Sequence, residues 1–357
     1  MSVLIRVRDG AATIIPAEAS DDDATAPFAV ALVEARGALL RWDVLSDETH
    51  PDAVVWDAAA ARDVLEEFYG VEVAEAVAGP TAATIPVTPG SGTTSSGTAR
   101  TLAMLTWARA WWPAGAAVPA LDPAILDAEI ALATAAVEHL LDDDEAVERA
   151  LADAAGAEHA LRRVPALAAE AAQLSEMLAA LAEDYGVDLD ADTTGPVAAA
   201  PREEWALAAG GHAPSAGIEL GGGTAAVAWR DVPAQTVAAD VDARWALRQK
   251  GALYLHVCVT AAPGDGDTAL RARFGPAALG IDVTLQREGA GFHATAEVPD
   301  EVVSLPAAER TLWVRDPRLV DEPGPAEDSR LRGGIVALAL ARLAHPNTLA
   351  ERAAVGR

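Results

Sequence analysis

The chain of 357 residues has a single cysteine, Cys258, and a single lysine, Lys250. One cysteine cannot form a disulfide within the chain, which excludes a disulfide-stabilised fold and fits a reducing compartment. Charged residues, including Arg6, Arg8 and Asp9, stand too early for the apolar region of a signal peptide. No run of about 20 apolar residues could span a bilayer. We therefore expect a cytoplasmic protein.

Basic side chains are scarce relative to acidic ones: the chain has 26 Lys and Arg and 54 Asp and Glu, which gives a formal net charge of −28. Nucleic-acid binding needs clustered Lys and Arg to neutralise phosphates, so this composition argues against a nucleic-acid partner. It also disfavours adhesion to an anionic membrane surface. A protein partner or self-association remains, and no cofactor is expected because no complete cofactor-binding motif is present.

The first part of the chain, residues 1–90, predicts a small α/β unit. Two apolar strand pairs flank the turn signals Asp9-Gly10 and Arg36-Gly37, which indicates two hairpins. Residues 57–69 carry apolar side chains at helical spacing and end before Gly70, a favoured helix stop.

Residues 98–186 predict four helices, over about 100–112, 123–141, 144–163 and 166–185. The second begins with Asp122 and Pro123, a typical N-cap followed by a first-turn proline. Short connections between such helices favour an antiparallel helical bundle. Residues 187–217, rich in Ala, Gly and Pro, are interpreted as a linker.

Residues 218–357 change to short segments of two-residue periodicity separated by turn residues. Seven such segments, followed by a helix over 328–344, predict a C-terminal antiparallel β-sandwich closed by a helix. The fold class expected for the whole chain is therefore α+β and multidomain.

Tryptophan is over-represented among the aromatics, with nine Trp against three Tyr and four Phe. Trp107 and Trp111 align on one helix at i and i+4, whereas Trp112 is rotated by about 100°. These indoles can supply core volume, or they can form a docking face, since Trp is a frequent interface anchor. The sequence predicts Trp112 as the candidate anchor.

Two segments of the β-rich region place reactive side chains on one sheet face. Leu253 and its alternate neighbours point inward, so His256 and Cys258 share the outer face, and His293 shares it if the strands are neighbours. Such a set can ligate zinc or form a Cys–His pair. Neither a CxxC nor an HExxH motif supports this alternative, and a solvated face explains the pattern more simply.

The Gly/Ser/Thr segment at 89–98 follows a strand candidate and precedes a helix, as phosphate-binding loops do. A phosphate-binding P-loop has Lys after its second glycine, and Thr98 stands there. Whether this loop binds an anion stays open, and a linker that caps the helix explains it equally well.

These observations favour a non-enzymatic protein-interaction or adaptor protein. Two alternatives remain: a hydrolase or metal-dependent enzyme that uses His256, Cys258 and His293, and a β-sandwich that binds sugar or peptide through exposed Trp.

Overall fold

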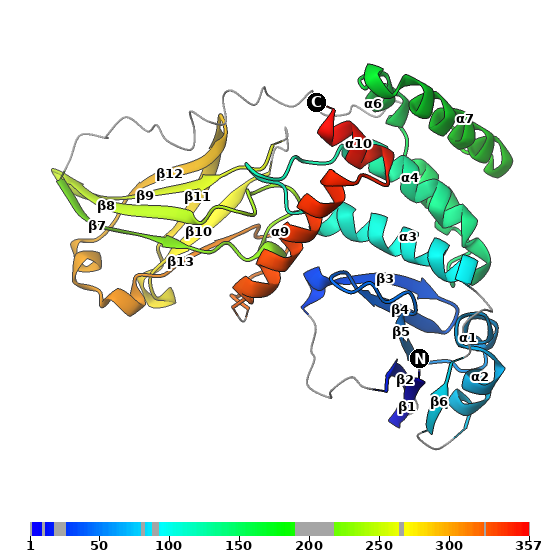
Figure 1. Cartoon of the computed structure of the whole chain (residues 1–357). Coiled ribbons are helices and arrows are strands. Elements are labelled where there is room, and N and C mark those ends of the chain that lie inside the picture. The colour runs from blue at the N-terminus through cyan, green and yellow to red at the C-terminus, as the bar shows by residue number, and fades with distance from the viewer. Residues whose placement is uncertain are drawn as a thin grey trace. The chain divides into compact units, whose positions relative to one another are not determined.

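The computed structural model describes residues 2–8, 11–17, 26–79, 83–87, 93–189, 218–263, 268–324 and 326–356. The fold is mixed α and β, with two antiparallel sheets (Figure 1). Its contacts divide the chain into two compact units. Unit 1 comprises Met1–Arg109, Leu121–Thr193 and Arg342–Arg357, and unit 2 comprises Ala110–Ala120 and Thr194–Ala341. Each unit contains one of the sheets.

The sheet of unit 1 has six strands in the order β3-β4-β5-β2-β1-β6. Both hairpins predicted from the sequence are present, as β1 with β2 and β3 with β4. Gly37 in the second turn has φ +65° and no space for a Cβ beside the Asp57 carbonyl, which explains why the turn needs glycine. The strands span Ser2–Arg8, Ala11–Pro16, Val30–Ala35, Ala38–Asp43, Asp52–Val55 and Ala83–Pro86 for β1 to β6.

Two short helices, α1 (Arg62–Tyr69) and α2 (Val71–Val77), follow β5. The buried face of α1 carries Val64, Leu65 and Phe68, at the helical spacing expected from the sequence. The Tyr69 hydroxyl donates a hydrogen bond of 2.7 Å to the Pro51 carbonyl, so the helix is attached to the chain just before β5.

The helical region of the chain is more divided than predicted. The expected helix over 144–163 is two helices, because Gly156 adopts a left-handed backbone with φ +90° between them. The region therefore lacks the four continuous helices expected, and an antiparallel bundle of four is not confirmed. The helices are α3 (Thr93–Trp111), α4 (Pro123–Ala136), α5 (Ala146–Asp153), α6 (Ala157–Arg162) and α7 (Ala168–Tyr185). Helix α4 contacts α5, α6 and α7.

The chain ends with α9 (Ser329–Ala344) and α10 (Leu349–Val355). Thr348 and Glu351 form a capping box at the start of α10, which fixes where this helix begins. Helix α10 packs against α4 in unit 1, which corrects the prediction that residues 218–357 form one β-rich region with the C-terminus.

The sheet of unit 2 has seven antiparallel strands in the order β13-β10-β11-β12-β9-β8-β7. The sequence predicted a sandwich of two sheets; the structure has one sheet that curls, so that β13 contacts β7 and β8. The strands are β7 (Ile218–Ala225), β8 (Ala243–Lys250), β9 (Ala252–Thr260), β10 (Leu270–Phe274), β11 (Asp282–Glu288), β12 (Gly291–Glu297) and β13 (Leu312–Arg315).

The curled sheet encloses its own hydrophobic core. Leu253, Leu255, Val257 and Val259 of β9 are all buried, as the two-residue alternation predicted. A Cβ on Gly223 of β7 would lie about 2.9 Å from the indole of the core residue Trp245. Glycine at this position therefore leaves space for a large core side chain.

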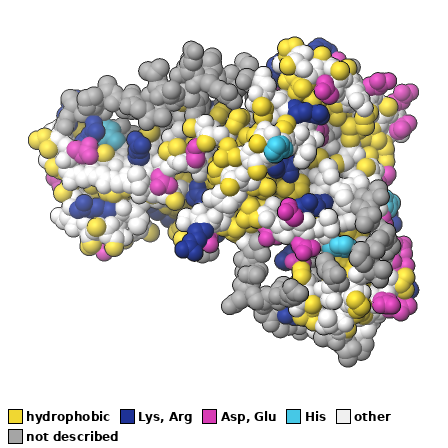
Figure 2. Space-filling model, in the orientation of Figure 1, with side chains coloured by type: hydrophobic (Ala, Val, Ile, Leu, Met, Phe, Trp, Pro, Cys, Tyr) yellow, Lys and Arg dark blue, Asp and Glu magenta, His cyan; other side chains and the backbone are white. Residues whose placement is uncertain are grey.

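Among the described helices, none is long and apolar enough to cross a membrane. On the face drawn in Figure 2, acidic side chains are dispersed over the helices and the sheet of unit 1.

Candidate functional site

The three tryptophans proposed as a docking face do not form one exposed surface. Trp107 and Trp112 are each 2% exposed, and only Trp111 is half-buried. The Trp107 Nε1 donates to the Phe28 carbonyl at 2.8 Å, and the Trp112 Nε1 donates to the Pro119 carbonyl at 2.9 Å. Both buried indoles have the satisfied N–H groups typical of core tryptophans. The chain itself buries Trp112, which favours core volume over a docking face as the role of this residue.

The sheet face predicted to carry reactive side chains does exist. Strands β9 and β12 are neighbours, with His293 opposite Cys258 and Thr295 opposite His256. The Thr295 Oγ1 lies 2.9 Å from the His256 Nδ1. The strand adjacency on which this alternative depended is therefore present, and the side chains of this face are half-buried or exposed.

The chemistry of this face does not favour a nucleophilic cysteine. Burial raises the pKa of the Cys258 thiol, which reduces the fraction of thiolate at neutral pH. Burial also lowers the pKa of His256, and the charge of Arg248 acts in the same direction. Throughout the described part of the chain, no three His, Cys, Asp or Glu side chains gather closely enough to hold a metal ion. His256, Cys258 and His293 thus share a face without forming such a group.

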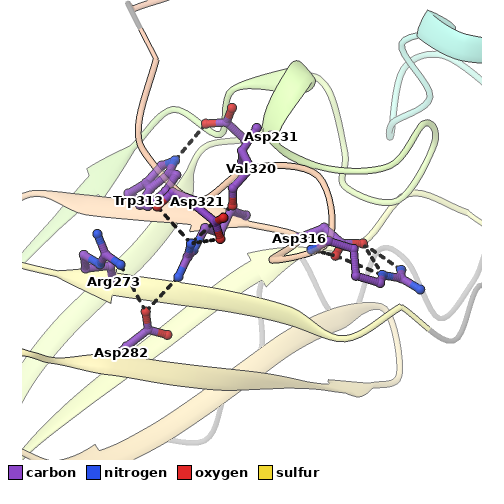
Figure 3. Close-up of polar contacts among 9 residues, drawn as sticks. Asp231, Arg273, Asp282, Trp313, Asp316, Val320 and Asp321 are labelled. Carbon is purple, nitrogen blue, oxygen red and sulfur yellow. Dashed lines mark hydrogen bonds and ion pairs between the residues drawn. The ribbon is translucent and has the colours of Figure 1, made fainter.

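A polar network lies on the outer side of β10, β11 and β13 in unit 2 (Figure 3). The Arg315 guanidinium lies 4.6 Å from the centre of the Trp313 ring and donates to Asp282 at 3.1 Å. It also donates to the carbonyls of Val320 and Asp321, both at 3.2 Å. Arg315 therefore ties the segment after β13 to the sheet.

The same network continues through two buried carboxylates. Asp231 accepts a hydrogen bond of 2.7 Å from the Trp313 Nε1, and the Asp316 backbone N–H donates to the Asp231 carbonyl at 2.7 Å. The hydrogen bonds from Arg318 lower the pKa of Asp316. Because these groups are used to hold neighbouring chain segments together, we assign the network a structural role.

A cleft of about 580 Å³ lies within unit 1, between β3 and helices α3, α4 and α5. This volume is in the range of pockets that bind small ligands or short peptide segments. The cleft combines apolar and charged side chains, and it is lined by Leu32, Val33, Glu34, Leu102, Thr106, Arg109, Asp127, Ile130, Thr134, Leu141, Ala146, Arg149, Ala150 and Asp153.

One wall of this cleft is the edge of a sheet. Strand β3 is the outermost strand of the six, and its three consecutive residues Leu32, Val33 and Glu34 line the cleft. Leu32 is 45% exposed, so its apolar side chain is available for contact beside the cleft. A sheet edge presents backbone N–H and C=O groups that another strand can pair with.

The charges around the cleft are partly paired. Arg109 and Asp127 form a hydrogen-bonded ion pair at 2.7 Å, and burial raises the pKa of Asp127 despite this pair. Arg149 pairs with Asp143 outside the cleft. Among the described residues, Glu34 and Asp153 have no cation within 4.0 Å, so two exposed carboxylates at this cleft are available to a ligand.

The Gly/Ser/Thr loop at 89–98, for which anion binding was left open, lies largely outside the described residues. Residues 88–92 are outside the described residues, and residues 93–98 belong to α3. Whether this segment binds an anion is therefore not tested by the described residues.

Comparison of the chain with protein-family models, curated proteins and solved structures gives no match. Sequence reasoning did not find the cleft because its lining residues are scattered over 122 positions, from Leu32 to Asp153. The one local signal was the alternation in β3, where Leu32 and Glu34 fall on the face opposite the buried Val33.

Proposed function

We propose that this chain is a non-enzymatic protein-interaction protein, an adaptor, and that the unit 1 cleft binds its protein partner. The observation that carries this proposal is the edge of β3, which lies open along a cleft large enough for a short peptide segment. Pockets of this size that combine an apolar lining with a few polar groups are the usual form of binding sites.

The composition of the cleft supports a polypeptide ligand. Leu32 and Ile130 offer apolar contact, while Glu34 and Asp153 offer charge on the same cleft. Protein interfaces combine an apolar centre with a polar rim in this way. The enzyme alternative receives no comparable support, because the raised pKa of Cys258 disfavours the thiolate form.

The test is a selection of displayed random peptides on the full chain and on a variant with a filled cleft. Thr106 lies on the exposed side of α3 and lines the cleft, so Thr106→Trp places an indole in it. Thr101, on the same helix, is also exposed but does not line the cleft, so Thr101→Trp is the matched control.

We expect peptides enriched on the unmodified chain to bind the Thr101→Trp variant equally and to lose at least about tenfold in affinity for the Thr106→Trp variant. Circular dichroism of both variants checks that they fold. If no peptide is enriched, or if the enriched peptides bind both variants equally, the cleft is not the binding surface.

We also propose the finer architecture expected from the sequence, with modules over 1–90 and 98–186, a linker over 187–217 and a β-rich module that begins at residue 218 and, by the contacts of unit 2, ends at Ala341. The separate sheets of units 1 and 2 support dividing the first module from the last. Limited proteolysis of the full chain tests this: first cleavage inside 187–217 supports the division, and first cleavage within a module argues against it.

A further inference from the structure

We propose that the unit 1 cleft binds its partner by strand addition, and that the added strand is basic. An extended segment would pair with the open edge of β3 and place Lys or Arg beside Glu34 and Asp153. This inference rests on the proposed function, because it specifies the ligand of the same cleft. Strand addition is a common mode of peptide recognition, in which backbone hydrogen bonds give affinity and alternate side chains give specificity.

The hairpin geometry identifies which backbone groups of β3 face outward. The two-residue turn at Arg36-Gly37 makes Ala35 and Ala38 the closing pair, so the odd-numbered residues of β3 bond to β4. The Val44 N–H donates to the carbonyl of Ala29 at 3.0 Å, so this odd-numbered residue just before β3 also bonds toward the β4 side. The even-numbered residues, Leu32 and Glu34 among them, therefore direct their N–H groups away from β4.

The open part of the edge is short and has defined ends. At one end, the Arg36 N–H donates to the Leu140 carbonyl at 2.9 Å, and Ala35 forms a bridge with Leu141. At the other end, the Val30 N–H donates to the Pro27 carbonyl. Within the described part of the chain, the groups of this edge that remain for a ligand are the Val30 carbonyl, both backbone groups of Leu32 and the Glu34 N–H. A strand that pairs with Leu32 at its centre can use all four groups.

The side chains beside this edge determine which strand fits. Leu32 and Glu34 project from the same face of β3, two residues apart, and both are exposed. Directly opposed residues of paired strands have Cβ atoms about 4.5–5.5 Å apart, so an apolar residue fits opposite Leu32 and a basic one opposite Glu34. Asp153 adds a second exposed carboxylate on the cleft. The net charge of −28 further favours encounter with a basic partner.

The probe is a labelled heptapeptide, Thr-Lys-Thr-Val-Thr-Lys-Thr, whose lysines and valine fall on one face in either strand direction. Binding to the full chain is measured by fluorescence anisotropy at low salt. We expect Glu34→Gln and Asp153→Asn each to weaken binding by about two- to fivefold, as for exposed charge pairs. Glu176→Gln, at an exposed carboxylate on α7 outside the cleft, should leave it unchanged. A peptide with Glu in place of Lys should not bind.

Two modifications test the backbone pairing itself. Leu32→Pro removes an outward N–H without removing a bond to β4, a position where edge strands tolerate proline. We expect it to weaken binding by at least about tenfold, more than Leu32→Ala does. When the peptide pairs antiparallel to β3 with its valine opposite Leu32, N-methylation at the valine removes a donor that faces β3, whereas the N–H of an adjacent threonine faces the other way. The valine modification should abolish binding and the threonine modification should preserve it, even if Leu32→Pro fails to fold.

The outcomes separate the two proposals. If the probe does not bind, or binds equally with either methylation, strand addition is wrong. The cleft can still be the binding surface if selected peptides remain sensitive to Thr106→Trp. If selected peptides are insensitive to Thr106→Trp as well, both proposals fail.

Discussion

Two arginines of unit 2 lie over the same tryptophan ring but differ in burial. The Arg315 side chain is 7% exposed and the Arg273 side chain 30%, and both pair with Asp282. Arg315 also donates to two backbone carbonyls, whereas Arg273 lies 3.7 Å from the Asp282 carboxylate. The planar guanidinium suits this combination of stacking and forked hydrogen bonding.

Arg315→Ala should therefore lower the free energy of unfolding by about 1.5–3 kcal/mol, because it removes a buried guanidinium together with its hydrogen bonds to Asp282, Val320 and Asp321. Arg273→Ala should cost less, about 1 kcal/mol or below, because its side chain is partly solvated and its ion pair with Asp282 is long, at 3.7 Å. Urea denaturation of both variants measures the difference. Equal costs for the two variants would contradict the structural role assigned to Arg315.

At the scale of elements, the C-terminal helix α10 is held by a carboxylate from another helix. The Glu129 side chain of α4 accepts hydrogen bonds from the backbone N–H groups of Leu349 and Ala350, at 2.6 and 3.2 Å. These are N–H groups of the first turn, which have no partner within the helix. Burial raises the pKa of Glu129 above its usual value of 4.5, and the two backbone hydrogen bonds offset part of this effect.

The raised pKa of Glu129 determines how its contribution to the free energy of unfolding changes with pH. A carboxyl with a higher pKa in the folded state contributes stability below pH 4.5, and this contribution is lost as pH rises through the folded-state value. Glu129→Gln removes the titrating group. The free energy of unfolding of the unmodified chain, minus that of the variant, should therefore fall as the pH rises above 4.5. A difference that rises over this range would show that the hydrogen bonds to α10 outweigh burial. Glu176→Gln, at an exposed site, is the control.

Sequence periodicity predicted the elements of this chain better than their assembly. The strands from β9 to β13, the hairpin of β3 with β4 and helix α9 all occur close to the segments expected from the sequence. Alternation shows which side chains point inward, as in β9, but it does not show which strands pair. A single curled sheet and a two-sheet sandwich have the same alternation, so the sequence could not separate them.

The tryptophan residues show a second limit of the sequence. A rotation of about 100° between Trp111 and Trp112 shows that they face different directions on a helix. It does not show what lies in each direction, and the chain itself buries Trp112. The cleft was not predictable for a related reason, since its walls come from four elements with no shared motif.

At the scale of the whole molecule, charge limits the possible partners. With a formal net charge of −28, the chain should not bind unrelated duplex DNA or RNA at physiological salt, because repulsion opposes the encounter. An electrophoretic mobility assay measures this. A salt-sensitive shift with unrelated duplexes would contradict the expectation that the partner is a basic protein segment.

The central claim is that the edge of β3 in unit 1 is an open binding edge. Amide hydrogen exchange of the full chain, with and without the lysine-containing heptapeptide, tests it most directly. Without peptide, the N–H groups of Ala31 and Val33, which bond to β4, should exchange slowly, and those of Leu32 and Glu34 should exchange faster. With peptide, exchange at Leu32 and Glu34 should slow markedly. Leu32 and Glu34 amides that are already protected without peptide, or that do not change when the peptide binds, would contradict the account.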